Sequence, residues 1–502
     1  MTKLIKNKKD ITKKFFLFFL IFQPFLDCYL LYSDEVINFF GFSPTTILRI
    51  AIIGIYALYI YLSNKKSRKA ITIYGVIIAI YMTIHHIIGT SINNNLIYET
   101  LKYSITDEMF YLLRMLMPVG VMYIVYNLEY TKEDFKNVIK YSSIGIALIL
   151  IILNISGLAL TSYSYNHDTI QGTIFNWFNN NISNYDLASK GWFNSANQIS
   201  ATIIIFIVMM IYYTIIDTKK KDIIILTLLI VSTMMIGTRT STTIVVYVTF
   251  FMVIGYTVIS SLLEHKFSLN KKQVSYSVFI TLFALLFYGI APIGHCQSNN
   301  NYQCLFNIDT GLNSRDKIEV DKNLKYDGDT CNFLTKTPTN PEYYTKIYPC
   351  EKNLQFWDNF SKQKIYEYAN NRTMEVLVTK DIYSKIDNTK INLFGMSRSR
   401  FLNAELYIEK DIYVHYYTMG IIGIILLLIV PYIVPCIILI YKIIKTKHID
   451  YYELSLTFIT ALIFLASYLS GHILDELIAT LYLGFTTGML LLGMKDNTNQ
   501  TK

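Results

Sequence analysis

Charged residues are scarce in this chain of 502 residues: they make up 16%, whereas hydrophobic residues make up 53%. The mean hydropathy of +0.35 is not that of a soluble enzyme. The apolar residues lie in long uninterrupted runs and not at helical or strand period, and such runs are typical of bilayer spans. The composition therefore predicts a polytopic protein embedded in a lipid bilayer.

Cysteine is scarce as well. Six cysteines exclude a small disulfide-dense fold, and because no Cys-x-x-Cys pair occurs, redox chemistry is disfavoured. Four of the six lie in one polar stretch, at positions 296, 304, 331 and 350. If that stretch lies in an oxidising compartment, two disulfides are expected. The local pairing joins Cys296 with Cys304 and Cys331 with Cys350, but four cysteines allow three connectivities and the sequence does not choose among them.

Motifs for metal and nucleotide chemistry are missing. The sequence has no His-x-x-x-His or His-Glu-x-x-His pair, so we expect no metal site, and it has no phosphate-binding P-loop, which disfavours a nucleotide-driven pump. Asp327-Gly328-Asp329 could hold a hard cation through its carboxylates. A turn is the better interpretation, because Asp-Gly is a common turn signal and no further ligands accompany it.

Twelve apolar runs have the length of a bilayer span. They lie near 15–33, 45–63, 70–90, 108–127, 139–160, 199–216, 222–237, 240–262, 275–292, 416–441, 454–472 and 476–493. The prediction is an all-α polytopic membrane protein with about twelve transmembrane helices and a large outer loop between the ninth and tenth. Residues 1–292 hold spans one to nine, 293–415 form an extracytoplasmic loop domain, partly helical and with disulfides, and 416–502 hold spans ten to twelve and a cytoplasmic tail.

The charges of the connections give the orientation. Alternate connections, counted from the lysine-rich N-terminus, carry a large net positive charge, and the opposite set is net negative. By the positive-inside rule both termini are cytoplasmic. The formal net charge of +9 thus orients the spans, and we expect no nucleic-acid partner. Within the large loop, apolar residues over 354–390 lie at mixed helical spacing and predict two helices.

Ionisable residues within or beside spans are candidates for function, because a charge in hydrocarbon is costly. They are Arg114, Arg239, His85, His86, His472, Asp475 and Glu476, all on the outer half. Their common depth predicts one site that faces away from the cytoplasm. Snorkelling to the headgroups is an equally good explanation for the last three. Arg239 lies among small hydroxyl residues in GTRTST (237–242), which leave room for an anion such as phosphate.

Several stretches, taken in chain order, resemble the O-antigen ligase and polymerase family of polytopic glycosyltransferases. They are FFLFFLIFQPFLDCY (15–29), GWFNSANQIS (191–200), MMIGTRTSTT (234–243), an Arg-led helix with an apolar-Phe-Gly turn (369–401) and YIEKDIYVHYYTMGIIGIILL (407–427), which ends in Gly-x-x-Gly. The large loop between the ninth and tenth of twelve spans also matches the family. The resemblance implies a GT-C-like fold in the bacterial cytoplasmic membrane.

The resemblance also implies an activity. Members transfer a glycan from an undecaprenyl-diphosphate-linked oligosaccharide donor to a glycan acceptor hydroxyl at the outer membrane face, with inversion and without a metal or other cofactor. A chain-length regulator is a further candidate partner. By resemblance, Arg239 and Arg372 hold the diphosphate, with Arg114 as a third clamp. For Arg372 the alternative is a surface ion pair with Glu375, one turn away.

The general base is less clearly marked. Ligase members carry a His ahead of the Gly-x-x-Gly turn, whereas this sequence has Glu409 and Asp411 there; Glu409 is the first choice and Asp411 the second. His415 lies closer to the span than the family's His. Three further residues are candidates for substrate binding: Asn194, Asn197 and Arg398. The alternative for the two asparagines is an ordinary helix N-cap.

The sequence therefore predicts a polymerase or ligase of surface polysaccharide, and the missing His favours a glycan polymerase of the Gram-positive kind. The alternative is a lipid-linked oligosaccharide flippase or other secondary transporter, because twelve spans also suit two six-span halves. The large outer loop and the lack of similarity between the halves disfavour it. A sensor or scaffold would not explain the intramembrane arginines.

Overall fold

A computed structural model describes most of the chain. The described residues are 2–28, 35–36, 39, 43–92, 102–163, 168–178, 182, 184–264, 270–291, 326–334, 348–365, 371–386, 389–403, 408–447, 449–469 and 471–500. They belong to two compact units. Unit 1 comprises Met1–Ile71, Leu113–Leu305 and Ile429–Lys502, and unit 2 comprises Thr72–Leu112 and Phe306–Leu428. The predicted division at residues 292 and 415 follows membrane topology and stays a prediction.

Nine helices within the described residues are long and apolar enough to cross a membrane. They are α4 (Pro44–Ser63), α5 (Lys65–Ser91), α6 (Ile105–Leu128), α7 (Lys132–Ile155), α9 (Ala196–Asp217), α12 (Lys271–Ile290), the continuous segment Asp411–Thr446, α23 (Tyr451–Leu469) and α24 (Leu477–Gln500). The chain is thus a multi-pass, all-α membrane protein, which confirms the predicted fold class.

The other three predicted spans are helices too: α1 (Thr2–Phe22), α10 (Lys220–Ile236) and α11 (Arg239–Glu264). α1 has 21 residues, α10 has 17 and α11 has 26. Each of the twelve predicted spans overlaps a helix, the first only over residues 15–22 of α1, and the number that cross the membrane stays a prediction.

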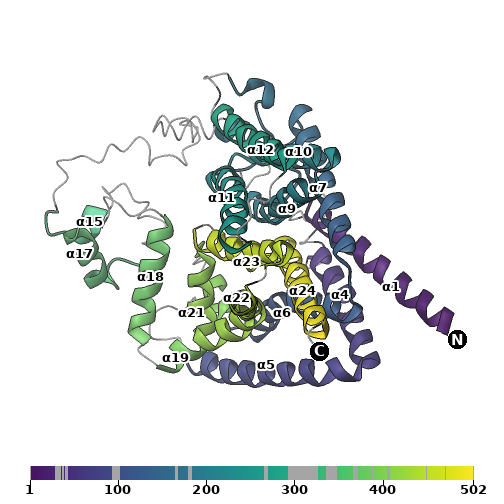
Figure 1. The fold of residues 1–502 in the computed structure, drawn as a ribbon. Helices are drawn as coiled ribbons and strands as arrows, with labels where there is room; N and C mark the ends of the chain where they lie inside the picture. The colour runs from purple at the N-terminus through teal and green to yellow at the C-terminus, as the bar shows by residue number, and fades with distance from the viewer. Residues whose placement is uncertain are drawn as a thin grey trace. The chain divides into compact units, whose positions relative to one another are not determined.

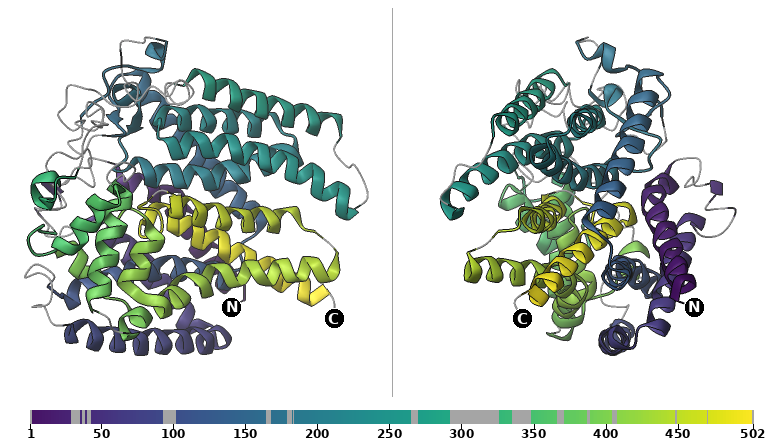
Figure 2. Two further views of the ribbon diagram at one scale, coloured as in Figure 1. Left: turned by 90° about the vertical axis from the view of Figure 1, so that its left-hand side faces the viewer. Right: turned by 45° about the vertical axis from the view of Figure 1, so that its right-hand side comes forward.

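In unit 1 the central helix is α9, which packs against α7, α10, α11, α12, α23 and α24. Figure 1 shows it among α7, α10, α11 and α12, and the teal helices of this part run side by side in Figure 2. Its 18-residue apolar window is 89% buried, because the helix is hydrophobic all round and protein surrounds it. Two of its buried hydroxyls are satisfied within the helix: the Ser200 hydroxyl donates to the Ala196 carbonyl and the Thr202 hydroxyl to the Gln198 carbonyl.

A small two-stranded hairpin follows α7. Strand β1 (Leu160–Thr161) pairs antiparallel with β2 (Ser189–Gly191), and the short helices η3 (Ile174–Asn176) and α8 (Asn184–Leu187) lie between them in sequence. The buried Asn154 side chain, near the end of α7, donates to Ser189 Oγ and accepts from the Ile174 N–H, at 2.9 Å each. One asparagine thus fixes the hairpin on the helix end.

Unit 2 has its own core around Trp357 and Phe333. The core is built from α15 (Thr330–Leu334), α17 (Leu354–Lys362), α18 (Asn371–Ile386), α19 (Thr389–Phe394), α20 (Arg398–Asn403) and α21 (Asp411–Ile424). The two helices predicted within 354–390 are α17 and α18, which confirms that expectation. A disulfide joins Cys331 to Cys350, as in the local pairing, whereas Cys296 and Cys304 lie outside the described residues.

The predicted tenth span is not one regular helix. α21 continues through the π-helical segment η7 (Ile425–Ile433) into α22 (Val434–Thr446). α21 itself is broken at Gly420, where φ is 70° and ψ is 179°. This break allows a turn of the large loop to approach the helix backbone.

Candidate functional site

Unit 2 brings the predicted phosphate-binding arginine and the predicted base together. Arg372, in the first turn of α18, donates from Nε to Oε2 of Glu409, which lies two residues before α21. The two side chains are 38% and 32% exposed, so both also reach solvent. The buried carboxylate of Glu375, one turn along α18, accepts the backbone N–H of Glu409 at 2.8 Å. Glu375 therefore fixes the backbone that carries the candidate base.

The second-choice base is more enclosed. Asp411 is the first residue of α21 and is buried, and a carboxylate there is favoured by the helix dipole. One turn on, His415 is fully buried, with its Nδ1 2.9 Å from the Tyr111 hydroxyl. The Arg398 guanidinium lies over the ring of the same tyrosine, 5.3 Å from its centroid. Of these acid–base candidates, Glu409 has the best access to a substrate.

Two glycines bring the turn after α19 against the break in α21. Gly395 has φ +83°, and a Cβ there would lie 2.1 Å from the Thr418 carbonyl oxygen; a Cβ on Gly420 would lie 2.4 Å from the Gly395 nitrogen. The Ser397 N–H donates to the Thr418 carbonyl at 3.0 Å. Because backbone touches backbone at positive φ, both positions require glycine. The apolar-Phe-Gly turn and the Gly-x-x-Gly stretch are thus two halves of one contact.

A buried ionic cluster holds the same turn from the other side. His85 Nδ1 lies 2.6 Å from the Phe394 carbonyl oxygen and Nε2 lies 3.2 Å from Glu108 Oε2, while Glu108 Oε1 accepts the Ser399 N–H at 2.5 Å. Because a carbonyl only accepts, Nδ1 is the donor in the contact with Phe394. His85 was a candidate from the sequence because of its position within a predicted span. Glu108 was not a candidate, because it looked like an ordinary charged residue in the first turn of a span.

Arg400 was also missed. It is 2% exposed, and Nη2 donates to the Gly89 carbonyl at 2.6 Å and to the Ile92 carbonyl at 3.3 Å. These carbonyls lie at the C-terminal end of α5, where a cation opposes the negative end of the helix dipole. Arg400 therefore attaches the loop to α5, and its neighbour Arg398 remains the candidate for substrate.

In unit 1, Arg114 meets a residue that the sequence also singled out. Its Nη2 donates to Glu476 Oε2 at 3.1 Å and to the Asp475 carbonyl at 2.9 Å, and both side chains of the ion pair are about a fifth exposed. The carboxylate of Glu476 is therefore not simply snorkelling. A diphosphate that binds Arg114 would have to share this guanidinium with Glu476.

Arg239 is the first residue of α11, directly after the turn at Gly237, where φ is +65°; its side chain lies outside the described part of the chain. Loop residues fix this turn, because the Ser162 hydroxyl donates to the Ile236 carbonyl at 2.6 Å and the Tyr163 hydroxyl to the Gly237 carbonyl at 2.9 Å. The N-terminus of a 26-residue helix favours an anion, as does the arginine charge.

The asparagines lie where two of the resembling stretches meet. The Asn194 N–H donates to the Asp27 carbonyl at 2.9 Å, and Cys28 forms an antiparallel bridge with Phe193. Both Asn194 and Asn197 are half-buried at the start of α9, and the N-cap of that helix is Ser195. Their N-cap alternative is therefore wrong, and their role in substrate binding stays a prediction.

A buried arginine lies behind this junction and was not singled out by the sequence. Arg49 Nη1 donates to Asp27 Oδ1 at 2.7 Å and Nη2 to the Gln23 carbonyl at 2.6 Å. Arg49 is 1% exposed and Asp27 is 5% exposed. The helix break at η1 (Gln23–Asp27), which begins with Gln23-Pro24, frees the carbonyl that Arg49 uses. This pair is enclosed and structural, and it offers no access to a ligand.

The fold and the site define a class: a multi-pass, all-α membrane protein with a helical loop unit in which an arginine and a carboxylate pair within reach of solvent. Over the described residues, no group of three or more His, Cys, Asp or Glu is placed to hold a metal ion. Residues 9–497 match the family described as O-antigen ligase like membrane protein, and the chain belongs to this family. Membership implies a membrane enzyme of the glycosyltransferase type that acts in glycan assembly on lipid-linked substrates. Neither the curated proteins nor the solved structures gave a match.

Proposed function

We propose that the protein transfers glycan repeat units from an undecaprenyl diphosphate carrier to an acceptor hydroxyl at the outer face of the bacterial cytoplasmic membrane, and that it polymerises them. Both termini lie in the cytoplasm in this proposal. The observation that carries it is the Arg372–Glu409 pair, which combines a phosphate-binding cation with a carboxylate that reaches solvent. Family membership supports the coarser reaction class.

The family resemblance implies an inverting displacement. In this proposal Glu409 takes the proton of the acceptor hydroxyl, the hydroxyl oxygen attacks the anomeric carbon, and the bond from that carbon to the diphosphate breaks. Arg372 is proposed to stabilise the negative charge that develops on the departing diphosphate, without the need for a metal, and the resemblance assigns the same role to Arg239 and Arg114. When the diphosphate engages Arg372, it competes with Glu409 for the guanidinium, so donor binding frees the carboxylate to act as base.

The environment of the histidine supports a polymerase over a ligase. His415 is fully buried against Tyr111, so it is poorly placed to meet an acceptor, whereas Glu409 is about a third exposed. A carboxylate base in this position distinguishes the chain from ligases that carry a His ahead of their Gly-x-x-Gly turn.

The test uses purified protein in lipid nanodiscs, mixed with a lipid-linked repeat unit in the presence of a chelator. We expect longer glycan on gels, and no lengthening with Arg239→Ala or Arg372→Ala protein that is equally abundant and folded. Lengthening at the wild-type rate by either variant contradicts the assigned roles. Movement of the lipid-linked unit across the bilayer without bond formation would instead indicate a flippase.

A deletion experiment in cells distinguishes a polymerase from a ligase. After deletion, single repeats on the surface indicate a lost polymerase, whereas full-length chains left on the lipid carrier indicate a lost ligase.

A further inference from the structure

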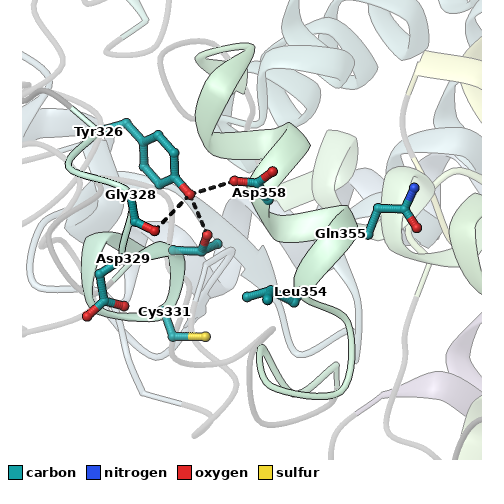
Figure 3. Close-up of a pocket in the computed structure, with 8 residues that line it drawn as sticks. Tyr326, Gly328, Asp329, Cys331, Leu354, Gln355 and Asp358 are labelled. Atoms are coloured by element: carbon teal, nitrogen blue, oxygen red, sulfur yellow. Dashed lines mark hydrogen bonds between the residues drawn. The ribbon is translucent and has the colours of Figure 1, made fainter.

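A groove lies between α15 and α17 in unit 2, away from the Arg372–Glu409 pair in sequence and sharing no residue with it. Its volume is about 1030 Å³, and its lining includes Tyr326, Asp329, Thr330, Leu354, Gln355 and Asp358 (Figure 3). Small-molecule pockets span roughly 300–1,000 Å³. The groove is therefore large enough for an extended ligand of several rings.

The walls of the groove are fixed in place. The Cys331–Cys350 disulfide joins α15 to the segment that leads into α17, and Phe333 and Trp357 form a buried core behind them. Across the groove, the Tyr326 hydroxyl donates to Asp358 Oδ1 at 2.5 Å, and because its only proton is used there, the Thr330 hydroxyl donates to it at 2.6 Å. A rigid site loses little conformational entropy when a ligand binds.

The lining suits a polyhydroxylated ligand and opposes an anion. Asp329 and Asp358 accept hydroxyl protons, the Gln355 amide donates and accepts, and the Tyr326 ring and Leu354 offer apolar surface to C–H groups. Among the described lining residues none is cationic. The hydrogen bond from Lys362 and that from Tyr326 hold the pKa of Asp358 below its usual range, so its negative charge persists. The carboxylates of Asp329 and Asp358 disfavour a phosphate, in contrast to the arginine site.

We propose that this groove binds the growing glycan chain, a neutral or amino-sugar oligosaccharide, while the arginines bind the lipid diphosphate. The proposal rests on the proposed function and adds that two sites share the substrate. The arginines bind the charged diphosphate, and the groove binds the hydroxyl groups of the sugar chain. A held chain stays near the transfer site between additions, so the groove would set product length and not the chemistry of a single transfer.

Leu354→Arg tests the groove directly. Leu354 is 54% exposed, so the change is compatible with folding, and the long cation would fill the groove and pair with its carboxylates. Asn359→Arg is the matched control, because Asn359 is exposed on the same helix and does not line the groove. The probe is a set of oligosaccharides released by partial acid hydrolysis from the surface polysaccharide of the host cell. Saturation-transfer NMR with the full-length protein in nanodiscs measures binding.

We expect wild-type and Asn359→Arg proteins to bind the oligosaccharides equally, and Leu354→Arg to weaken binding by about tenfold or more. In cells, Leu354→Arg should shorten the polysaccharide while the first transfer proceeds at its normal rate. Equal binding and equal chain length in all three proteins would overturn the proposal. Loss of transfer in the wild-type assay would count against the proposed function alone, because the NMR measurement still reports on the groove.

Discussion

The Arg372 guanidinium donates a hydrogen bond to the Glu409 carboxylate across 37 positions of sequence, and both groups remain partly open to solvent. Each partner of this pair satisfies the charge of the other. In the proposed function, a lipid diphosphate that binds the guanidinium would displace the carboxylate and leave it free to accept a proton.

Glu409→Gln should lower the rate of glycan transfer by about 100-fold or more, since an amide cannot take the acceptor proton. The measurement is the initial rate of chain lengthening in nanodiscs at saturating donor. Lys410→Gln is the matched control, because it removes the neighbouring charge and leaves the carboxylate. A wild-type rate of transfer in Glu409→Gln protein would show that the general base is Asp411 or another residue.

Gly395→Ala and Gly420→Ala should each destabilise the protein by about 2 kcal/mol or more, because a Cβ would collide with backbone at a positive φ. Thermal unfolding in detergent, followed by intrinsic fluorescence, measures the loss. Gly54→Ala is the control: nothing lies within 4 Å of its Cβ position in α4, so a helical alanine there should be neutral or slightly stabilising. Equal melting of all three variants would disprove the backbone contact.

Arg49→Met should cost about 3–5 kcal/mol, since it leaves the buried Asp27 carboxylate without its cation. The double variant Asp27→Leu/Arg49→Met should recover much of that loss, because no unpaired charge is left behind. Thermal unfolding of Arg49→Met, Asp27→Leu and the double variant gives the coupling free energy between the two residues. Additive losses would mean that the two residues do not act as a pair.

Replacing Cys331 and Cys350 together by serine should destabilise the segment of α15 and α17 by about 3 kcal/mol, because the disulfide closes a separation of 19 residues. Hydrogen exchange of peptides from residues 326–334 and 348–365 should become faster. Cys28→Ser is the control, because Cys28 is a free thiol in unit 1. Unchanged exchange in the double variant would show that the core around Trp357 suffices.

Stability should rise with pH where Lys190 titrates. Burial lowers the pKa of this lysine in the folded protein, whereas the unfolded chain keeps the proton up to about pH 10.4. Between the two pKa values unfolding takes up a proton, so the free energy of unfolding increases with pH. Lys190→Met should stabilise the protein at neutral pH and flatten this rise in melting temperature. A steeper rise in the variant would mean that another group causes it.

The all-α membrane architecture could be predicted from the sequence because the bilayer imposes a length and an apolar composition on every span, and each of the twelve apolar runs overlaps a helix. The helix boundaries were harder to predict from the sequence. α7 begins at Lys132, seven residues before the apolar run, because Thr131 and Asp134 form a capping box. The short hairpin of β1 and β2 carries no periodic signal at all.

The site was predictable only in part. Arg372 and Glu409 were singled out separately, by resemblance, and their pairing depends on tertiary structure that brings α18 to the start of α21. Glu108 and Arg400 looked ordinary, since nothing local distinguishes a buried ionic contact from an interfacial charge. Their partners Ser399 and Gly89 lie about three hundred positions away in sequence. Such partners have no spacing rule that a single sequence could reveal.

The Arg49–Asp27 pair also constrains how the chain enters the membrane. A lone arginine or aspartate at mid-span costs about 2.5–3.5 kcal/mol on insertion scales. Asp27 is the last residue of η1 and Arg49 lies in the second turn of α4, so each charge is costly in the membrane until the two residues pair. The first two segments should therefore leave the insertion machinery as a hairpin, with α1 retained until α4 has been made. Early biogenesis, and not only the finished fold, depends on this one contact.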